Sequence, residues 1–116
     1  MSSSFRFGFE GIAAAAARER NVQIHCILSV MVLLSGFFFD INKYEWMAVI
    51  LCIGGMVSLE MMNTAIERTV DMYTEDFHPL AKQAKDIAAG AVLVFAIACV
   101  IIGMIIFLPK ISAWFS

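Results

Sequence analysis

The sequence predicts an all-α membrane protein, with an N-terminal amphipathic surface helix followed by three transmembrane helices. Hydrophobic residues make up 61% of the chain and charged residues 16%, whereas soluble domains average about 45–50% and about 25%. Three apolar segments, near 22–39, 46–72 and 87–108, are each close to the ~20 residues that cross a bilayer. Without a linker or an internal repeat, we expect residues 1–116 to form a single domain.

The N-terminal segment 5–17 has the spacing of an amphipathic helix. Phe5, Phe9 and Ile12 recur at helical intervals, and Arg6 and Glu10 fall on another side. This pattern is typical of a helix that lies on the membrane surface with its apolar face in the interface.

The connections between the predicted spans differ in length. Residues 40–43 form a short polar turn between the first two spans, and residues 74–85 form a longer polar loop before the third. We expect the third span to close at Pro109 and Lys110, because proline interrupts helices.

Basic residues predict the orientation of the chain. Lys43 and Lys110 fall on one side of the three spans, and the other basic residues fall on the opposite side: Arg6, Arg18, Arg20, Arg68, Lys82 and Lys85. The N-terminus and the 73–86 loop are therefore expected in the cytoplasm, and the C-terminus outside.

One stripe of polar side chains marks the cytoplasmic half of the second span. At about 100° per residue, Glu60, Asn63, Glu67 and Asp71 fall within an arc of about 80°. The rise from Trp46 to Glu60 is about 21 Å, so Glu60 sits roughly 9 Å below the interface of a ~30 Å core. A carboxylate at that depth is costly and indicates a functional site.

The residues of this stripe suit proton transfer. A carboxylate withdrawn from water binds a proton more readily, which makes Glu60 a candidate general base. Asn63, one turn later, could orient the base or a substrate. The alternative is structural: a protonated Glu60 and Asn63 could instead form polar contacts between helices.

Charged residues near the interface could bind a metal ion and phosphate. Glu19 and Glu67, expected at similar heights, are candidate ligands for a hard cation such as Mg²⁺. Lys85 could hold phosphate as a point charge. Alternatively, the two glutamates could be solvated charges beside the membrane, and Lys85 could be a positive anchor at its surface. The net charge of −2 gives no sign of nucleic-acid binding, and common nucleotide-binding glycine motifs are absent from the sequence.

The stripe belongs to a longer motif. Glu60-Met-Met-Asn63-Thr-Ala-Ile-Glu67-Arg-Thr-Val-Asp71 resembles the signature E-x-x-N-[ST]-A-I-E-x-x-[VI]-D of the prokaryotic integral-membrane diacylglycerol kinases and their undecaprenol kinase relatives. Ala84-Lys85-Asp86 and Glu19-Arg-Asn21 resemble two further blocks of that family. The resemblance extends from about Phe5 to Pro109.

This resemblance implies a homotrimer in a bacterial cell membrane that uses ATP and Mg²⁺ to phosphorylate a lipid hydroxyl. Glu60 matches the catalytic base that meets the lipid substrate, Asn63 matches the signature Asn near the reacting groups, and Glu19 and Glu67 match the metal-binding carboxylates. The positions that the resemblance assigns to ATP binding are Glu19, Glu67, Asp71, Asp76, Phe77, His78, Lys85 and Asp86.

Two segments resemble the Gram-positive undecaprenol kinase branch more than the diacylglycerol kinases. They run from Glu19 to His25 and from Asp76 to Lys82. We therefore expect undecaprenol as the substrate and keep diacylglycerol as the alternative.

Functions of other classes have weaker support in the sequence. A small ion- or proton-conducting oligomer would also place a carboxylate in a span. Such a pathway needs polar groups across the whole bilayer, whereas the 46–59 half of the second span has only Ser58. A purely structural subunit would not need Glu19, Glu67 and Lys85 at one height.

Overall fold

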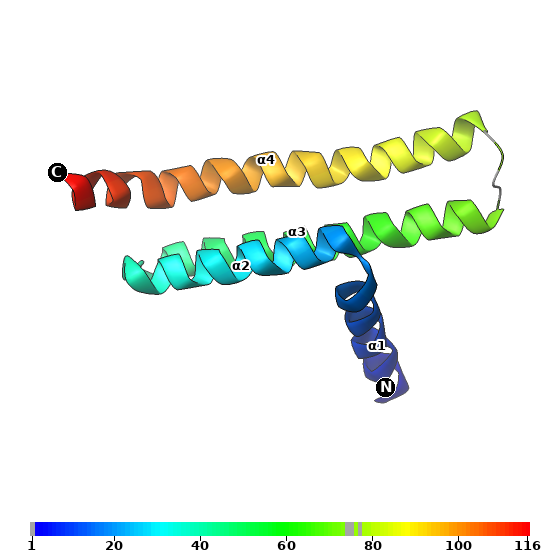
Figure 1. The fold of residues 1–116 in the computed structure, drawn as a ribbon, viewed down its shortest axis with the longest axis horizontal. Coiled ribbons are helices and arrows are strands. Elements are labelled where there is room, and N and C mark those ends of the chain that lie inside the picture. The colour runs from blue at the N-terminus through cyan, green and yellow to red at the C-terminus, as the bar shows by residue number, and fades with distance from the viewer. Residues whose placement is uncertain (1, 74–75, 77) are drawn as a thin grey trace.

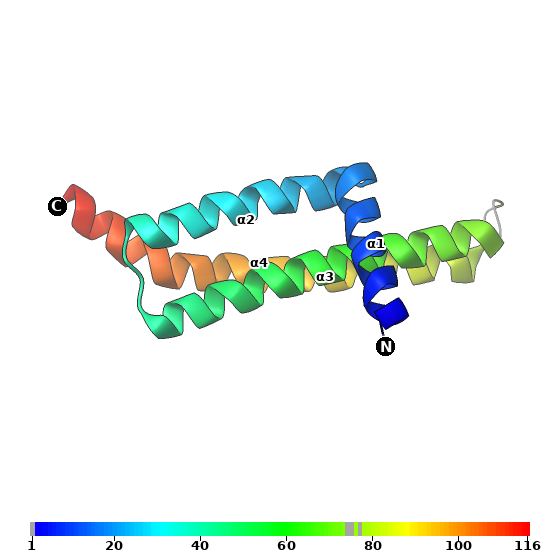
Figure 2. The same cartoon turned by 90° about the horizontal axis from the view of Figure 1, so that it is seen from below.

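Four helices make up the protein in a computed structural model that describes residues 2–73, 76 and 78–116. They are α1 (Ser2–Arg18), α2 (Arg20–Phe38), α3 (Lys43–Tyr73) and α4 (Pro79–Phe115). Helices α2, α3 and α4 lie along the long axis, with α3 packed against both α2 and α4, and α1 runs across them (Figures 1 and 2). The described residues contain no strand, and the predicted all-α fold is confirmed.

Helices α2, α3 and α4 are each long and apolar enough to cross a membrane. Within the most apolar 18-residue stretch of each helix, only 11%, 17% and 6% of the residues, respectively, are buried inside the subunit. Large side chains such as Leu51 and Val94 are 72% and 70% exposed. Apolar surface on this scale suits contact with lipid or with other subunits rather than with water.

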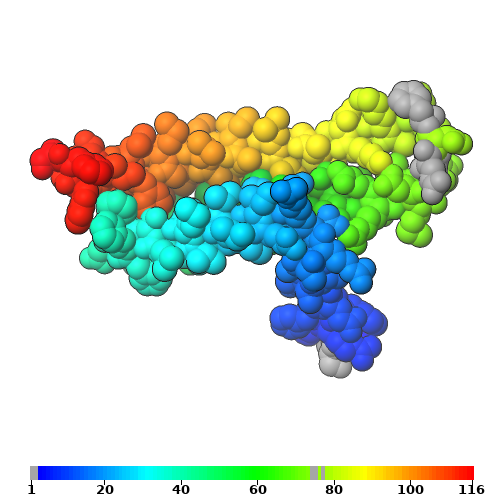
Figure 3. Space-filling model, in the orientation of Figure 1, coloured from blue at the N-terminus to red at the C-terminus, as the bar shows by residue number. Residues whose placement is uncertain are grey.

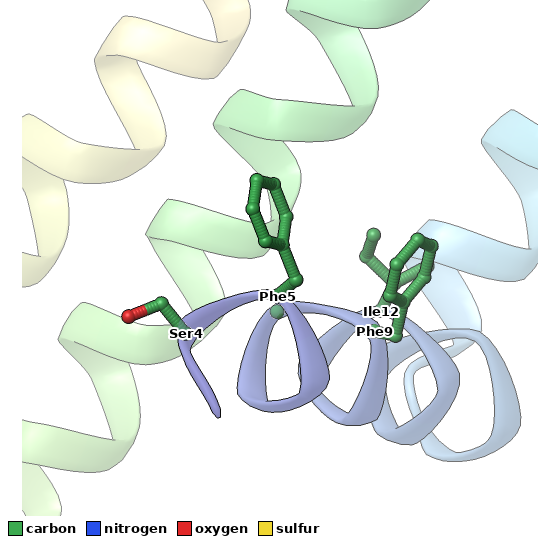
Figure 4. A pocket seen from close by; sticks show the side chains of 5 residues that line it. Ser4, Phe5, Phe9 and Ile12 are labelled. Carbon is green, nitrogen blue, oxygen red and sulfur yellow. The ribbon is translucent and has the colours of Figure 1, made fainter. Parts of the chain in front are cut away.

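Helix α1 has the amphipathic form that its spacing predicts. Phe5, Phe9 and Ile12 project from the same side of the helix and line a shallow apolar hollow (Figure 4). Arg6 and Glu10 form an ion pair of 3.7 Å on its exposed surface. Because α1 stands away from the body of the molecule (Figure 3), its apolar side is available to a membrane surface.

The turn between α2 and α3 is closed by two capping motifs. The N–H groups of Asp40 and Ile41 donate to the carbonyls of Phe37 and Gly36, at 3.3 and 3.1 Å. With Asp40 in the left-handed region at φ 52°, this is a Schellman motif. Asn42 and Glu45 then exchange backbone-to-side-chain hydrogen bonds of 3.0 and 2.9 Å, which begins α3 as a capping box.

Beside this turn lies the small apolar core of the subunit. Ile41, Val49 and Ile106 are 4%, 4% and 5% exposed and form one cluster. Aromatic rings surround it, with the Phe39 and Phe107 centroids 6.1 Å apart. The core therefore joins α2, α3 and α4 at the end of the bundle that holds the α2–α3 turn.

Helix α4 is longer than expected at both ends, so two predictions were wrong. Residues 79–85 belong to α4 rather than to a loop, because proline suits the first helical turn and His78 Nδ1 accepts a hydrogen bond of 3.2 Å from the Leu80 N–H. The helix also continues through Pro109 to Phe115. Lys110 Nζ lies 3.3 Å from Glu45 Oε2, which holds α4 to α3 just beyond the proline.

Candidate functional site

The polar side chains that the sequence singled out lie away from the α2–α3 turn, where the start of α2 meets the second half of α3. Glu60 and Asn63 are 5% and 9% exposed, and they are the buried polar or charged side chains among the described residues. They lie one turn apart on α3, inside the apolar part of the chain. Burial of this kind requires a partner for each polar group.

Glu60 finds its partner on a neighbouring helix. The Oε1 atom of Glu60 lies 3.1 Å from Nε2 of His25, on the first turns of α2. The two side chains are 7% and 24% exposed. An ion pair forms here when the imidazole is protonated, and the low polarity of the surroundings strengthens the attraction.

Asn63 contacts the next acid of the stripe rather than the base. Its Nδ2 donates a hydrogen bond of 3.3 Å to Glu67 Oε1. Its Oδ1 is buried and has no hydrogen-bond partner in the part of the chain that the structure describes. A buried acceptor without a donor is costly, so this atom is available to a donor from outside the subunit.

Glu19 lies between α1 and α2, and Arg68 of α3 donates a hydrogen bond to its Oε1. Arg68 follows Glu67 directly in the sequence. Its contact with Glu19 therefore shows that the two predicted metal ligands, Glu19 and Glu67, belong to segments that pack against each other. Among the described residues, no three His, Cys, Asp or Glu side chains are grouped to hold a metal ion. Whether Glu19 and Glu67 share an ion stays a prediction.

The predicted nucleotide residues of α3 and α4 meet across the far end of these helices. Lys85 Nζ of α4 donates to Asp71 Oδ1 of α3 at 2.5 Å, and within α4 Lys82 Nζ donates to Asp86 Oδ2 at 2.6 Å. Beside these pairs lies an open hollow of about 470 Å³, between the end of α3 and the start of α4, with walls that include Tyr73. The structure thus groups acids and lysines where phosphate was expected.

The other predicted ATP-binding positions belong to the segment just before α4. His78 caps α4 through its Nδ1, and Asp76 is exposed between the two helices. Phe77 lies outside the described residues.

Sequence reasoning gave no functional role to two residues that the structure joins to the site. His25 and Arg68 contact Glu60 and Glu19, respectively. Each contact joins residues far apart in the chain, and helical periodicity reports only which residues share a face of one helix. The depth of His25, one turn into an apolar span, was the available signal.

Known proteins resemble the chain over nearly its whole length. It is 54% identical over 108 residues to a protein of Bacillus subtilis (strain 168) named undecaprenol kinase, a match that covers 93% of this chain and 88% of the relative. It is 38% identical over 109 residues to a diacylglycerol kinase of Synechocystis, covering 93% of this chain and 62% of that protein. A diacylglycerol kinase of Escherichia coli (strain K12) is 25% identical over 95 residues, covering 82% and 78%.

The family profile described as prokaryotic diacylglycerol kinase matches residues 6–107. This range includes parts of all four helices, the buried Glu60 and Asn63, and the Asp71–Lys85 pair between α3 and α4. The chain therefore belongs to the prokaryotic diacylglycerol kinase family, a family of lipid kinases.

Proposed function

We propose that this lipid kinase transfers the γ-phosphate of ATP to the hydroxyl of undecaprenol, with Mg²⁺ as the metal ion. The observation that carries the proposal is the buried Glu60 carboxylate, 5% exposed inside a helix long enough to cross a membrane. The 54% identity to the Bacillus subtilis undecaprenol kinase supports this lipid. Diacylglycerol is the second candidate, because other relatives carry that name.

Glu60 acts as the general base in this proposal. It accepts the proton of the lipid hydroxyl, whose oxygen forms a bond to the γ-phosphorus while the bond to the β–γ bridging oxygen breaks and ADP leaves. The burial of Glu60 keeps water from the reacting oxygen, which limits ATP hydrolysis. No covalent enzyme intermediate is needed.

Asn63 assists by binding the substrate hydroxyl and by holding Glu67. Its Oδ1 is a buried acceptor without a donor among the described residues, and a substrate hydroxyl could supply that donor. Its Nδ2 meanwhile holds Glu67 at 3.3 Å. In this proposal Asn63 therefore joins the substrate hydroxyl to the acid expected to bind the metal.

Glu19 and Glu67 are the side chains that would hold Mg²⁺. Mg²⁺ commonly takes one or two protein carboxylates together with waters and phosphate oxygens, and these two glutamates would supply them. When bound, the ion would neutralise phosphate charge. Arg68 contacts Glu19 in the subunit, so nucleotide binding would draw Glu19 or Arg68 out of this pair.

Lys85 and the neighbouring acids form the expected nucleotide side of the site. The Lys85 side chain is 38% exposed and pairs with Asp71. An exposed ion pair contributes little to stability, so Lys85 can exchange Asp71 for a phosphate at small cost. Asp86, His78, Asp76 and Phe77 stay predicted positions on this side.

The proposed assembly is a homotrimer with the N-terminus and the 73–86 segment in the cytoplasm and the C-terminus outside. The few buried residues of the spans leave apolar surface for neighbouring copies, and small residues such as Ala89 and Gly90 allow close helix packing. The end of α3 and the start of α4 lie at one end of the bundle, α1 meets it partway along its length, and the C-terminus lies at the other end (Figure 1).

The test is transfer of phosphate from γ-labelled ATP to undecaprenol and to diacylglycerol, side by side in mixed micelles, with Glu60→Gln as the blank. Faster labelling of undecaprenol supports the proposed substrate, and faster labelling of diacylglycerol replaces it with the second candidate. If the folded protein labels neither lipid, the proposal fails.

A further inference from the structure

We propose that His25 is a positioning residue that orients Glu60 for proton transfer. The inference rests on the proposed function, because it concerns the general base of that reaction. Its starting point is the 3.1 Å separation between His25 Nε2 and Glu60 Oε1, which joins α2 to α3 inside the apolar part of the chain.

The burial of the two side chains strengthens the attraction between them. Glu60 is 7% exposed and His25 24% exposed in their side chains, so little water competes for the carboxylate. In such surroundings the attraction between an imidazole and a carboxylate is stronger than at a surface. A glutamate has several rotatable bonds, and a partner on another helix selects one orientation among them.

Among the described residues, His25 is the partner that Glu60 has. Asn63, one turn along α3, donates to Glu67 instead. The contact engages Oε1, and no ion pair or hydrogen bond to Oε2 occurs in the described part of the chain. This arrangement leaves Oε2 for the hydroxyl proton while His25 holds the other oxygen.

The surroundings of His25 favour the same role. The ring lines an open hollow of about 130 Å³ whose other walls are mostly apolar and include Leu28, Val32, Ile53 and Met56. His25 therefore has a charged neighbour on α3 and mostly apolar neighbours around the hollow, where the hydroxyl of Ser29 bonds to the backbone of α2 rather than to the ring. A histidine needed only for packing could be replaced there by leucine without loss.

Two substitutions separate positioning from packing. His25→Leu fills the space and removes the nitrogen, and we expect kcat for lipid phosphorylation to fall roughly 10- to 100-fold, since a misplacement of about 1 Å can cost about 10²-fold. KM for ATP and for the lipid should stay within about two-fold. His25→Gln places an amide nitrogen at similar reach and should restore most of kcat.

A double-mutant cycle tests whether His25 acts through Glu60. In a Glu60→Gln background, His25→Leu should cause no further loss of residual transfer, because coupled residues are not additive. Ser29→Ala is the matched control: Ser29 lines the same hollow, and its hydroxyl donates to the carbonyl of His25 on its own helix at 2.6 Å. Its activity should match that of the original protein.

Infrared difference spectra provide a readout that needs no lipid substrate. The spectrum of the protein minus that of Glu60→Gln isolates the Glu60 carboxyl bands, and His25→Leu should shift them while Ser29→Ala should not. If the original protein labels no lipid but the bands shift, the proposed function fails and the contact stands. Normal kcat in His25→Leu, an equal loss in the Glu60→Gln background, or unshifted bands would each overturn the role of His25.

Discussion

The two ends of the helix bundle differ in the side chains that they bury. At the α2–α3 turn, Ile41, Val49 and Ile106 form an apolar cluster of 4–5% exposure. Toward the other end, the buried side chains include Glu60 and Asn63, at 5% and 9%. The first end gains stability from packing and caps, whereas the second holds polar groups that cost stability unless they have partners.

This comparison indicates that the two ends of one short chain have different roles, stability at one and chemistry at the other. The turn end can carry the packing of three helices because its backbone groups are satisfied by the Schellman motif and the capping box. The site end can then keep a carboxylate in apolar surroundings and an amide oxygen without a donor among the described residues. Substitutions at the site end should therefore alter catalysis, and those at the turn end should alter stability.

Glu60→Gln should have the largest effect. The amide keeps the size of the side chain but cannot accept the hydroxyl proton, so we expect phosphate transfer to fall about 10²- to 10⁴-fold with the fold retained. Labelled phosphate in lipid measures the loss, and circular dichroism in detergent checks the helices. Glu10→Gln, on the exposed surface of α1, is the control; near-normal turnover in Glu60→Gln would refute its role as base.

Glu67→Gln should have the second-largest effect, a weaker binding of the metal ion. Loss of a charged ligand should raise the Mg²⁺ concentration for half-maximal activity by at least about 10-fold, the lower end of the effect of disturbing a metal site. A Mg²⁺ titration at fixed ATP measures it. Glu45→Gln breaks a contact with Lys110 at the turn end and should leave the Mg²⁺ dependence alone; an unchanged dependence in Glu67→Gln would remove Glu67 from the ligands.

Gly36→Ala tests the packing of the turn end. A Cβ at Gly36 would lie 2.7 Å from Trp46 Cη2 and 3.2 Å from Ile41 Cδ1, and overpacking of this kind costs about 1–3 kcal/mol. Gly54→Ala meets no heavy atom within 4 Å and gains the same helix propensity. Thermal unfolding in micelles should therefore show Gly36→Ala below Gly54→Ala, with equal activity at 25 °C; equal unfolding temperatures would contradict this packing.

Asp40→Gly should give the smallest effect, a gain. Asp40 adopts φ 52°, which costs an L-residue about 1–2 kcal/mol, and glycine loses about 0.5–1 kcal/mol more conformational freedom on folding. The net stabilisation is roughly 0.5–1 kcal/mol, visible as a higher unfolding temperature. Asp40→Ala removes the same charge but keeps the strain, so it should show no gain; an equal gain would assign the effect to charge.

Much of the fold could be predicted because its determinants are local. Apolar runs of bilayer length predicted α2, α3 and α4, and helical spacing predicted α1. The errors were local as well: the sequence predicted a loop over 79–85 and a stop at Pro109. Proline is tolerated inside spanning helices where neighbouring groups satisfy the freed backbone, and here the ion pair of Lys110 with Glu45 holds the residues after Pro109 to α3.

The four helices, the polar stripe from Glu60 to Asp71 and the lipid-kinase motif could all be predicted from the sequence, because each depends on residue type and spacing along one segment. Which polar groups meet is visible only in the packed helices: His25 contacts Glu60, Arg68 contacts Glu19, and Lys85 contacts Asp71. Two of these contacts join α3 to the start of α2 or the residue before it, and the third joins α3 to α4. Helical periodicity defines the face of one helix, and only packing defines what that face touches.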